Sequence, residues 1–181
     1  TLGDGAIDLH GTIAEKGWKV TLAETGTETL TGGRVRRVAR YLDGDEFMVT
    51  YGDGVADIDV AALVSHHRAH RRLATVTAVH PSSRFGELAV EGGMVTVFRE
   101  KPQVHEGWIN GGFFVFDRKV LDRLTSDDDS LEAGLLAGLA ADNQLAVYQH
   151  RGFWQCMDTL REYQILKVQW ESGRAPWAVL H

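Results

Sequence analysis

Two aspartates carry the most specific chemistry in the sequence. Asp53 follows the apolar, β-prone run 47–50 (FMVT) and stands between Gly52 and Gly54. A carboxylate at the carboxyl end of a strand lies where open α/β sheets bind ligands, and Mg²⁺ prefers carboxylate oxygens together with substrate phosphates. The alternative is a plain Asp-Gly turn. Asp158 follows the apolar stretch GFWQCM, and it is either a second metal carboxylate or a support for the cap of the next helix.

The stretch 31–37 (TGGRVRR) is a candidate anion site. Thr31 can cap a helix whose first turn contains Gly32, Gly33 and Arg34. Free N–H groups at a helix start favour anions, and glycine lets a ligand approach closely. Arg34 adds a forked cation suited to phosphate. The alternative is a capped helix with solvated arginines, and the stretch taken alone favours it.

Two more stretches combine polar groups with a strand. In FREKPQ, Lys101 can pair with a phosphate and Glu100 with sugar hydroxyls, although a surface ion pair beside a turn is the simpler reading. In WINGGFFVF, Asn110 and Gly111 lie inside an apolar strand. Glycine within a strand marks the close approach of a ligand or of another part of the chain.

The elements that position these residues alternate between strand and helix. Periodicity predicts strands at 18–25, 46–50, 73–80, 109–117 and 144–150, two strands within 85–101, and helices at 31–42, 59–72, 130–143 and 159–173. Asp59 is a predicted N-cap, Thr159 and Glu162 have capping-box spacing, and Gly173 suits a helix end. We therefore expect an α/β fold with a mostly parallel, Rossmann-like sheet, helices on both faces and a smaller antiparallel extension.

Composition limits the function classes. The 181 residues suffice for one domain, and a net charge of -6 argues against non-specific nucleic-acid binding. No apolar run has transmembrane length, and no signal peptide opens the chain. The single cysteine, Cys156, permits no internal disulfide, and we interpret it as a small core residue. We expect a cytoplasmic protein with neither a nucleic-acid nor a membrane partner.

The quoted stretches, taken with WKVTLAETG, RFGEL, GFWQCMDTLRE and ESGRAPW, share their order and spacing with a known family. Over about residues 18–177, the chain resembles the sugar-phosphate nucleotidyltransferases, and within them the cytidylyltransferase group. The resemblance implies that CTP and α-D-glucose 1-phosphate react to CDP-glucose and pyrophosphate, for the deoxysugars of bacterial surface polysaccharides. It also implies Mg²⁺ as cofactor and a homo-oligomer.

The resemblance also implies roles for individual residues. It makes Asp53 and Asp158 the metal ligands and Lys101 the third catalytic group, which neutralises the sugar phosphate beside Glu100. It also places Thr29, Arg34 and Gly52 in the nucleotide site. It places Gly86, Asn110 and Gly111 in the sugar pocket. Gly32 and Gly33 are further candidates for the nucleotide site, because they belong to the candidate anion site at 31–37.

One part of the family pattern is not found. The family begins with a phosphate loop of the type Gly-Gly-x-Gly-Thr-Arg-Leu, followed by Lys-Pro, and the sequence contains neither this loop nor a Lys-Pro that follows it. We therefore expect the chain to represent the C-terminal two-thirds of the family fold as a single domain. Two alternatives to cytidylyl transfer stay open: a transferase that uses UTP, dTTP or GTP, and a non-catalytic module that binds a nucleotide sugar.

Overall fold

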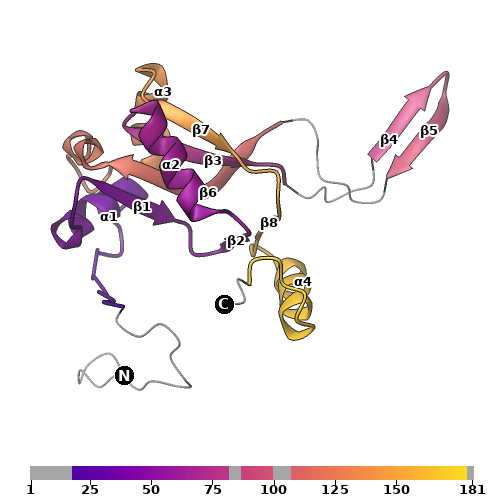
Figure 1. Ribbon diagram of the computed structural model, residues 1–181, viewed down its shortest axis with the longest axis horizontal. Helices are drawn as coiled ribbons and strands as arrows, with labels where there is room; N and C mark the ends of the chain where they lie inside the picture. Colours follow the sequence, from indigo (N-terminus) through magenta and orange to yellow (C-terminus); the bar gives the residue numbers. More distant parts are fainter. Residues whose placement is uncertain (1–17, 82–86, 100–106, 179–181) are drawn as a thin grey trace.

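The structure is a computed structural model that describes residues 18–81, 87–99 and 107–178. At its centre lies a four-stranded sheet in the order β1-β6-β3-β7 (Figure 1), formed by β1 (Glu46–Thr50), β3 (Ala74–Val79), β6 (Ile109–Asp117) and β7 (Leu145–Gln149). β3 and β7 are parallel, whereas β6 is antiparallel to both β1 and β3. The predicted α/β class is confirmed, but the described sheet is mixed rather than mostly parallel.

The connection between β3 and β6 explains the antiparallel pairing. Between these two strands the chain forms the hairpin of β4 (Glu87–Glu91) and β5 (Met94–Arg99), which projects beyond one end of the sheet (Figure 1). A parallel neighbour needs a crossover along the face of the sheet. Because the chain returns to the end of β3 that it left, β6 runs in the opposite direction. The hairpin is the predicted antiparallel extension.

Helices cover both faces of the sheet, as predicted. α2 (Val60–His70) packs on one face, where the ring of buried His67 is hydrogen-bonded through Nδ1 to the Thr75 hydroxyl of β3 (2.9 Å). The opposite face is covered by η3 (Leu131–Leu136), a stretch of π-helix that continues into α3 (Ala137–Ala141). The helix predicted at 130–143 is therefore present, but in two parts.

The main core lies between the sheet and η3. The ring centroid of Phe116 lies 5.4 Å from that of Phe47 and 5.6 Å from that of Phe114. These three rings belong to one core cluster with Leu131 and Leu139 of the covering helices. Phe47 and Phe116 are paired across β1 and β6, so they project to the same face. The apolar runs of the sequence thus build the core that holds the strand ends in place.

The prediction of a strand at 18–25 is wrong. The segment has no regular secondary structure and pairs with no described strand (Figure 1), and Trp18, Val20 and Leu22 are 76%, 74% and 86% exposed. Its apolar and polar residues alternate as in a strand, but a strand forms only where a neighbour satisfies its backbone groups. No described neighbour does so here.

The remaining elements are short or carry local signals. α1 (Thr31–Val38) continues into the 3₁₀ turn η1 (Ala39–Tyr41), and η2 (Arg118–Arg123) follows β6. α4 (Leu160–Glu171) begins with the predicted capping box, and Asp59 accepts the Ala62 N–H at the start of α2 (2.9 Å), as predicted. Gly173 has a φ of +67°, as expected after a helix end. Among the described helices, none is both long and apolar enough to span a bilayer.

Candidate functional site

A short strand pair brings the two aspartates together. β2 (Gly54–Ala56) and β8 (Trp154–Cys156) form an antiparallel ladder in which Gly54 faces Cys156. The ladder continues one step further, because the Met157 N–H donates to the Asp53 carbonyl (2.8 Å). Asp53 thus precedes one strand and Asp158 follows the other, so both carboxylates lie at the same end of the ladder.

That end of the ladder opens into a cavity of about 180 Å³. Its lining combines the end of β1, the start of β6 and the β2–β8 ladder. Among the predicted residues, the cavity is lined by Asp53, Asp158, Asn110 and Gly111. Gly52 adjoins Asp53, and a Cβ at Gly52 would meet open space. The structure therefore brings the predicted metal ligands and part of the predicted sugar pocket to one place.

The glycines of β6 shape this cavity. The β3–β6 register shifts between Val76 and Ala78, so β6 bulges next to Asn110. A Cβ at Gly111 would lie 2.7 Å from Val79 Cγ1, and one at Gly112, where φ is +79°, would lie 2.6 Å from Tyr51 Cδ2. The close approach predicted at these glycines is thus made by protein side chains. The bulge leaves the Gly111 carbonyl to accept the Trp154 indole N–H (2.8 Å).

The chemistry of the donors favours a hard cation. Cys156, Asp158 and Glu162 offer ligand atoms within 4.8 Å of one another. Burial, followed by the hydrogen bond to Asp158, raises the pKa of the Cys156 thiol to about 11, so the sulfur is protonated at neutral pH. Glu162 Oε2 accepts the N–H groups of Asp158 and Thr159 in the capping box. Asp158 and, across the ladder, Asp53 are the acidic residues that line the cavity.

α1 gives the predicted anion-site glycines a packing role. Gly32 and Gly33 are buried against the loop 127–129. A Cβ at Gly32 would lie 2.7 Å from the Asp129 carbonyl oxygen, and a Cβ at Gly33 would lie 2.6 Å from the Asp127 carbonyl oxygen. The prediction that Thr31 caps this helix is wrong, because Leu30 is the N-cap and Thr31 is already helical. The Thr31 hydroxyl instead donates to Glu132 Oε2 (2.9 Å).

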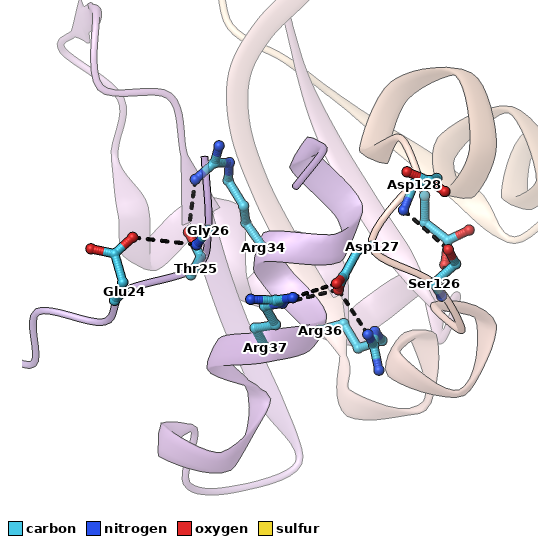
Figure 2. Close-up of polar contacts among 10 residues, drawn as sticks. Glu24, Thr25, Gly26, Arg34, Arg36, Arg37, Ser126, Asp127 and Asp128 are labelled. Carbon is cyan, nitrogen blue, oxygen red and sulfur yellow. Dashed lines mark hydrogen bonds and ion pairs between the residues drawn. The ribbon is translucent and has the colours of Figure 1, made fainter. Parts of the chain in front are cut away.

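The arginines of α1 hold the segments on either side of the helix (Figure 2). Arg34 donates to the Thr25 hydroxyl (2.8 Å) and to the Thr27 carbonyl (3.1 Å), whereas Arg36 and Arg37 both bind Asp127. Arg34 and the buried Thr29 are not among the residues that line the cavity. Their predicted nucleotide contacts therefore stay predictions, as do those of Gly32 and Gly33.

Three predicted residues, Gly86, Glu100 and Lys101, lie outside the described residues. Conversely, Tyr51, Trp154 and Glu132 have polar contacts in or beside the cavity that the sequence analysis did not predict. Tyr51 directly precedes the Gly52-Asp53 pair, so its position was the one signal that could have found it. Glu132 comes from a distant helix and has no local signal.

The fold and the cavity define an α/β protein with an acidic site at its strand ends, where such folds bind ligands. The chain belongs to the nucleotidyl transferase family, whose model matches residues 10–164. It is 45% identical to the glucose-1-phosphate cytidylyltransferase of Salmonella typhi over 97% of the chain and 68% of that relative, and 43% identical to a probable glucose-1-phosphate cytidylyltransferase of Bacillus subtilis over 90% of the chain. The resemblance found in the sequence, to this enzyme family and to its cytidylyltransferase group, is confirmed.

The solved structures agree with the fold. The inositol-1-phosphate CTP transferase of T. maritima superposes with a TM-score of 0.56 over 85% of this chain and 65% of that one, at 16% identity. The chain spans 64% of the length of the Bacillus subtilis relative.

Proposed function

We propose that this chain transfers the cytidylyl group of CTP to α-D-glucose 1-phosphate, giving CDP-glucose and pyrophosphate. The single observation that carries the proposal is the convergence of Asp53 and Asp158 on one cavity with Asn110 and Gly111. A module that only binds sugars has no need of two carboxylates from distant segments at one point. The 45% identity to a relative named for this activity supports the choice of substrates.

Mg²⁺ is the proposed cofactor, and the donors fit it. Asp53 and Asp158 offer oxygen ligands, and the protonated thiol of Cys156 does not compete for a hard cation. Two carboxylates leave the remaining positions of an octahedral ion to water and to the phosphates of the substrate. Bound there, the cation would neutralise charge at the α-phosphate.

The reaction needs positioning rather than a protein nucleophile. An oxygen of the sugar phosphate attacks the α-phosphorus of CTP, the bond to the β-phosphate oxygen breaks, and pyrophosphate leaves with that oxygen. Asp53 and Asp158 would hold the cation, which would supply the positive charge that keeps the α-phosphate in place. Asn110 is proposed to meet a sugar hydroxyl, and Lys101 and Glu100 are proposed to meet the sugar phosphate. A homo-oligomer in the cytoplasm is proposed on the resemblance alone.

The test is CTP-dependent release of pyrophosphate with glucose 1-phosphate, measured for the wild type and for Asp53→Asn. We expect the substitution to lower kcat/KM by about 100-fold or more, since it removes charge at the developing transition state. Asp59→Asn is the matched control, because asparagine caps a helix as well as aspartate does and Asp59 caps α2. Equal turnover in Asp53→Asn and the wild type would refute the metal site.

The same assay separates the alternatives. Supplying UTP, dTTP and GTP in place of CTP identifies the base, and we expect CTP to give the highest kcat/KM. A wild-type protein that binds glucose 1-phosphate in calorimetry but releases no pyrophosphate with any of the four nucleotides would be a binding module instead.

A further inference from the structure

A chain of hydrogen bonds links the cavity to two helices behind it. The Tyr51 hydroxyl, at the end of β1, donates to Glu132 Oε1 of η3 (2.6 Å), and it accepts Nδ2–H of Asn110 (3.1 Å). The other carboxylate oxygen of Glu132 accepts the hydroxyls of Thr31 (2.9 Å) and Ser130 (3.3 Å). Tyr51 and Asn110 line the cavity, whereas Glu132 and Thr31 do not.

The protonation states fix the direction of this chain. Burial acts to raise the pKa of Glu132, but the hydrogen bonds from Tyr51, Thr31 and Ser130 outweigh it, so the net pKa is lowered. At neutral pH a carboxylate can only accept and the phenol has one proton to give. Tyr51 must therefore donate to Glu132, which leaves its oxygen to accept from Asn110.

The amide of Asn110 is consequently held at both ends. Nδ2 donates to Tyr51, and Oδ1 accepts the Gly112 N–H (2.9 Å) in the bulge of β6. A carboxamide can flip and exchange its donor for its acceptor, but here each end has a partner of one kind. Asn110 therefore presents a fixed donor and a fixed acceptor to the cavity.

We propose that Glu132 is a positioning residue, which acts through Tyr51 to orient the Asn110 amide toward the hydroxyl groups of the sugar phosphate. The inference rests on the proposed function, because it assigns the cavity at Asn110 to the sugar. A site that hydrogen-bonds a substrate hydroxyl discriminates strongly against a sugar whose hydroxyl is elsewhere. Glu132 thus controls the choice between epimeric sugar phosphates without contacting the sugar.

The experiment compares the wild type with Glu132→Gln and Tyr51→Phe. Glutamine can donate as well as accept, so it no longer enforces the direction of the Tyr51 proton. Phenylalanine keeps the ring that packs edge-on against Phe114, at a centroid distance of 5.6 Å, and removes only the hydroxyl. Glu46→Gln is the matched control, because it removes a hydrogen-bonded carboxylate from the opposite end of β1, where Glu46 pairs with Arg68.

The measured quantity is the ratio of kcat/KM for glucose 1-phosphate to kcat/KM for galactose 1-phosphate, which does not depend on the folded fraction. We expect this ratio to fall by about fivefold to tenfold in both variants, the effect of one hydrogen bond. The KM for CTP should stay within about twofold, and Glu46→Gln should keep the wild-type ratio.

Two results would overturn the inference. One is an unchanged ratio in both variants. The other is an equal loss of kcat/KM for the two sugar phosphates and for CTP, which is the effect of a residue with a structural role alone. Calorimetric titration of the same four proteins with each sugar phosphate separates this failure from that of the proposed function. A wild type without turnover whose binding preference falls in both variants keeps the inference and refutes the proposed reaction. A wild type that binds neither sugar phosphate overturns both.

Discussion

The packing of α1 against the loop 127–129 predicts that Gly33→Ala destabilises the fold. This substitution tests whether Gly33 serves packing or the approach of a nucleotide. Replacing it by alanine adds a Cβ that would lie 2.6 Å from the carbonyl oxygen and 2.7 Å from the Cα of Asp127. Both atoms belong to the backbone, so no side-chain rotation relieves the overlap. The loop must move, although Leu30 N–H and Gly33 N–H hold it by hydrogen bonds of 2.9 and 3.1 Å to Asp127 and Asp129.

The magnitude follows from opposing effects. Overpacking of this kind costs about 2 kcal/mol, and each backbone hydrogen bond that the displaced loop loses costs about 1 kcal/mol. Alanine in a helix offsets about 1 kcal/mol of this, because glycine is the poorer helix former. We therefore expect Gly33→Ala to lower the free energy of unfolding by about 3 kcal/mol and Tm by roughly 6 to 12 °C.

The assay is thermal and urea unfolding followed by circular dichroism, with Gly138→Ala as the control. Gly138 lies in α3, and a Cβ there would meet no atom within 4 Å. The same substitution should therefore raise the free energy of unfolding by about 1 kcal/mol at this site. The two variants are predicted to shift stability in opposite directions.

A Gly33→Ala variant as stable as the wild type would refute the reasoning. If that variant also lost pyrophosphate release, the glycine would serve the approach of the nucleotide, as the sequence first suggested. A destabilised variant that keeps its turnover per folded molecule would assign the glycine to packing.

Three more predictions test local features. The arginines of α1, Arg37 foremost, lower the pKa of Asp127 to about 2. The stability that this provides is present above about pH 4 and is lost as the pH falls toward 2. In Asp127→Asn, the urea unfolding midpoint should therefore change less with pH over that range than in the wild type. The pKa of about 11 predicts that the Cys156 thiol reacts with iodoacetamide much more slowly at pH 8 than a free thiol does, and becomes fast only on unfolding. Thr159→Ala removes the hydroxyl that caps α4 and should cost about 1 kcal/mol in urea unfolding, whereas Thr159→Ser should restore most of it.

Local signals in the sequence determined the elements that depend on few partners. The apolar runs at 46–50 and 109–117 form β1 and β6, the Glu-Gly-Gly turn forms the β4–β5 hairpin, and the capping box at Thr159 begins α4. The signal for each of these lies in residues a few positions apart, although β1 and β6 also need each other as neighbours in the sheet. The order of the motifs along the chain also identified the family, because spacing along a chain is itself a property of the sequence.

The strands that depend on distant partners could not be predicted in this way. β2 and β8 have three residues each and no pattern of their own, and they exist because they pair with each other. The segment 18–25 has the pattern of a strand and no described partner. The direction of β6 followed from the path of the chain through the hairpin, which periodicity does not record.

The sequence by itself singled out Asp53 and Asp158 by their residue type and their places after apolar runs, and Asn110 by its place inside an apolar strand. Only the tertiary structure decided that these three line one cavity, that Gly32 and Gly33 pack against a loop, and that Glu132 stands behind Asn110. The physical reason is range. Caps, turns and alternation depend on neighbours along the chain, whereas a cavity and a hydrogen-bond network depend on contacts between segments that only the folded chain brings within a few ångströms of each other.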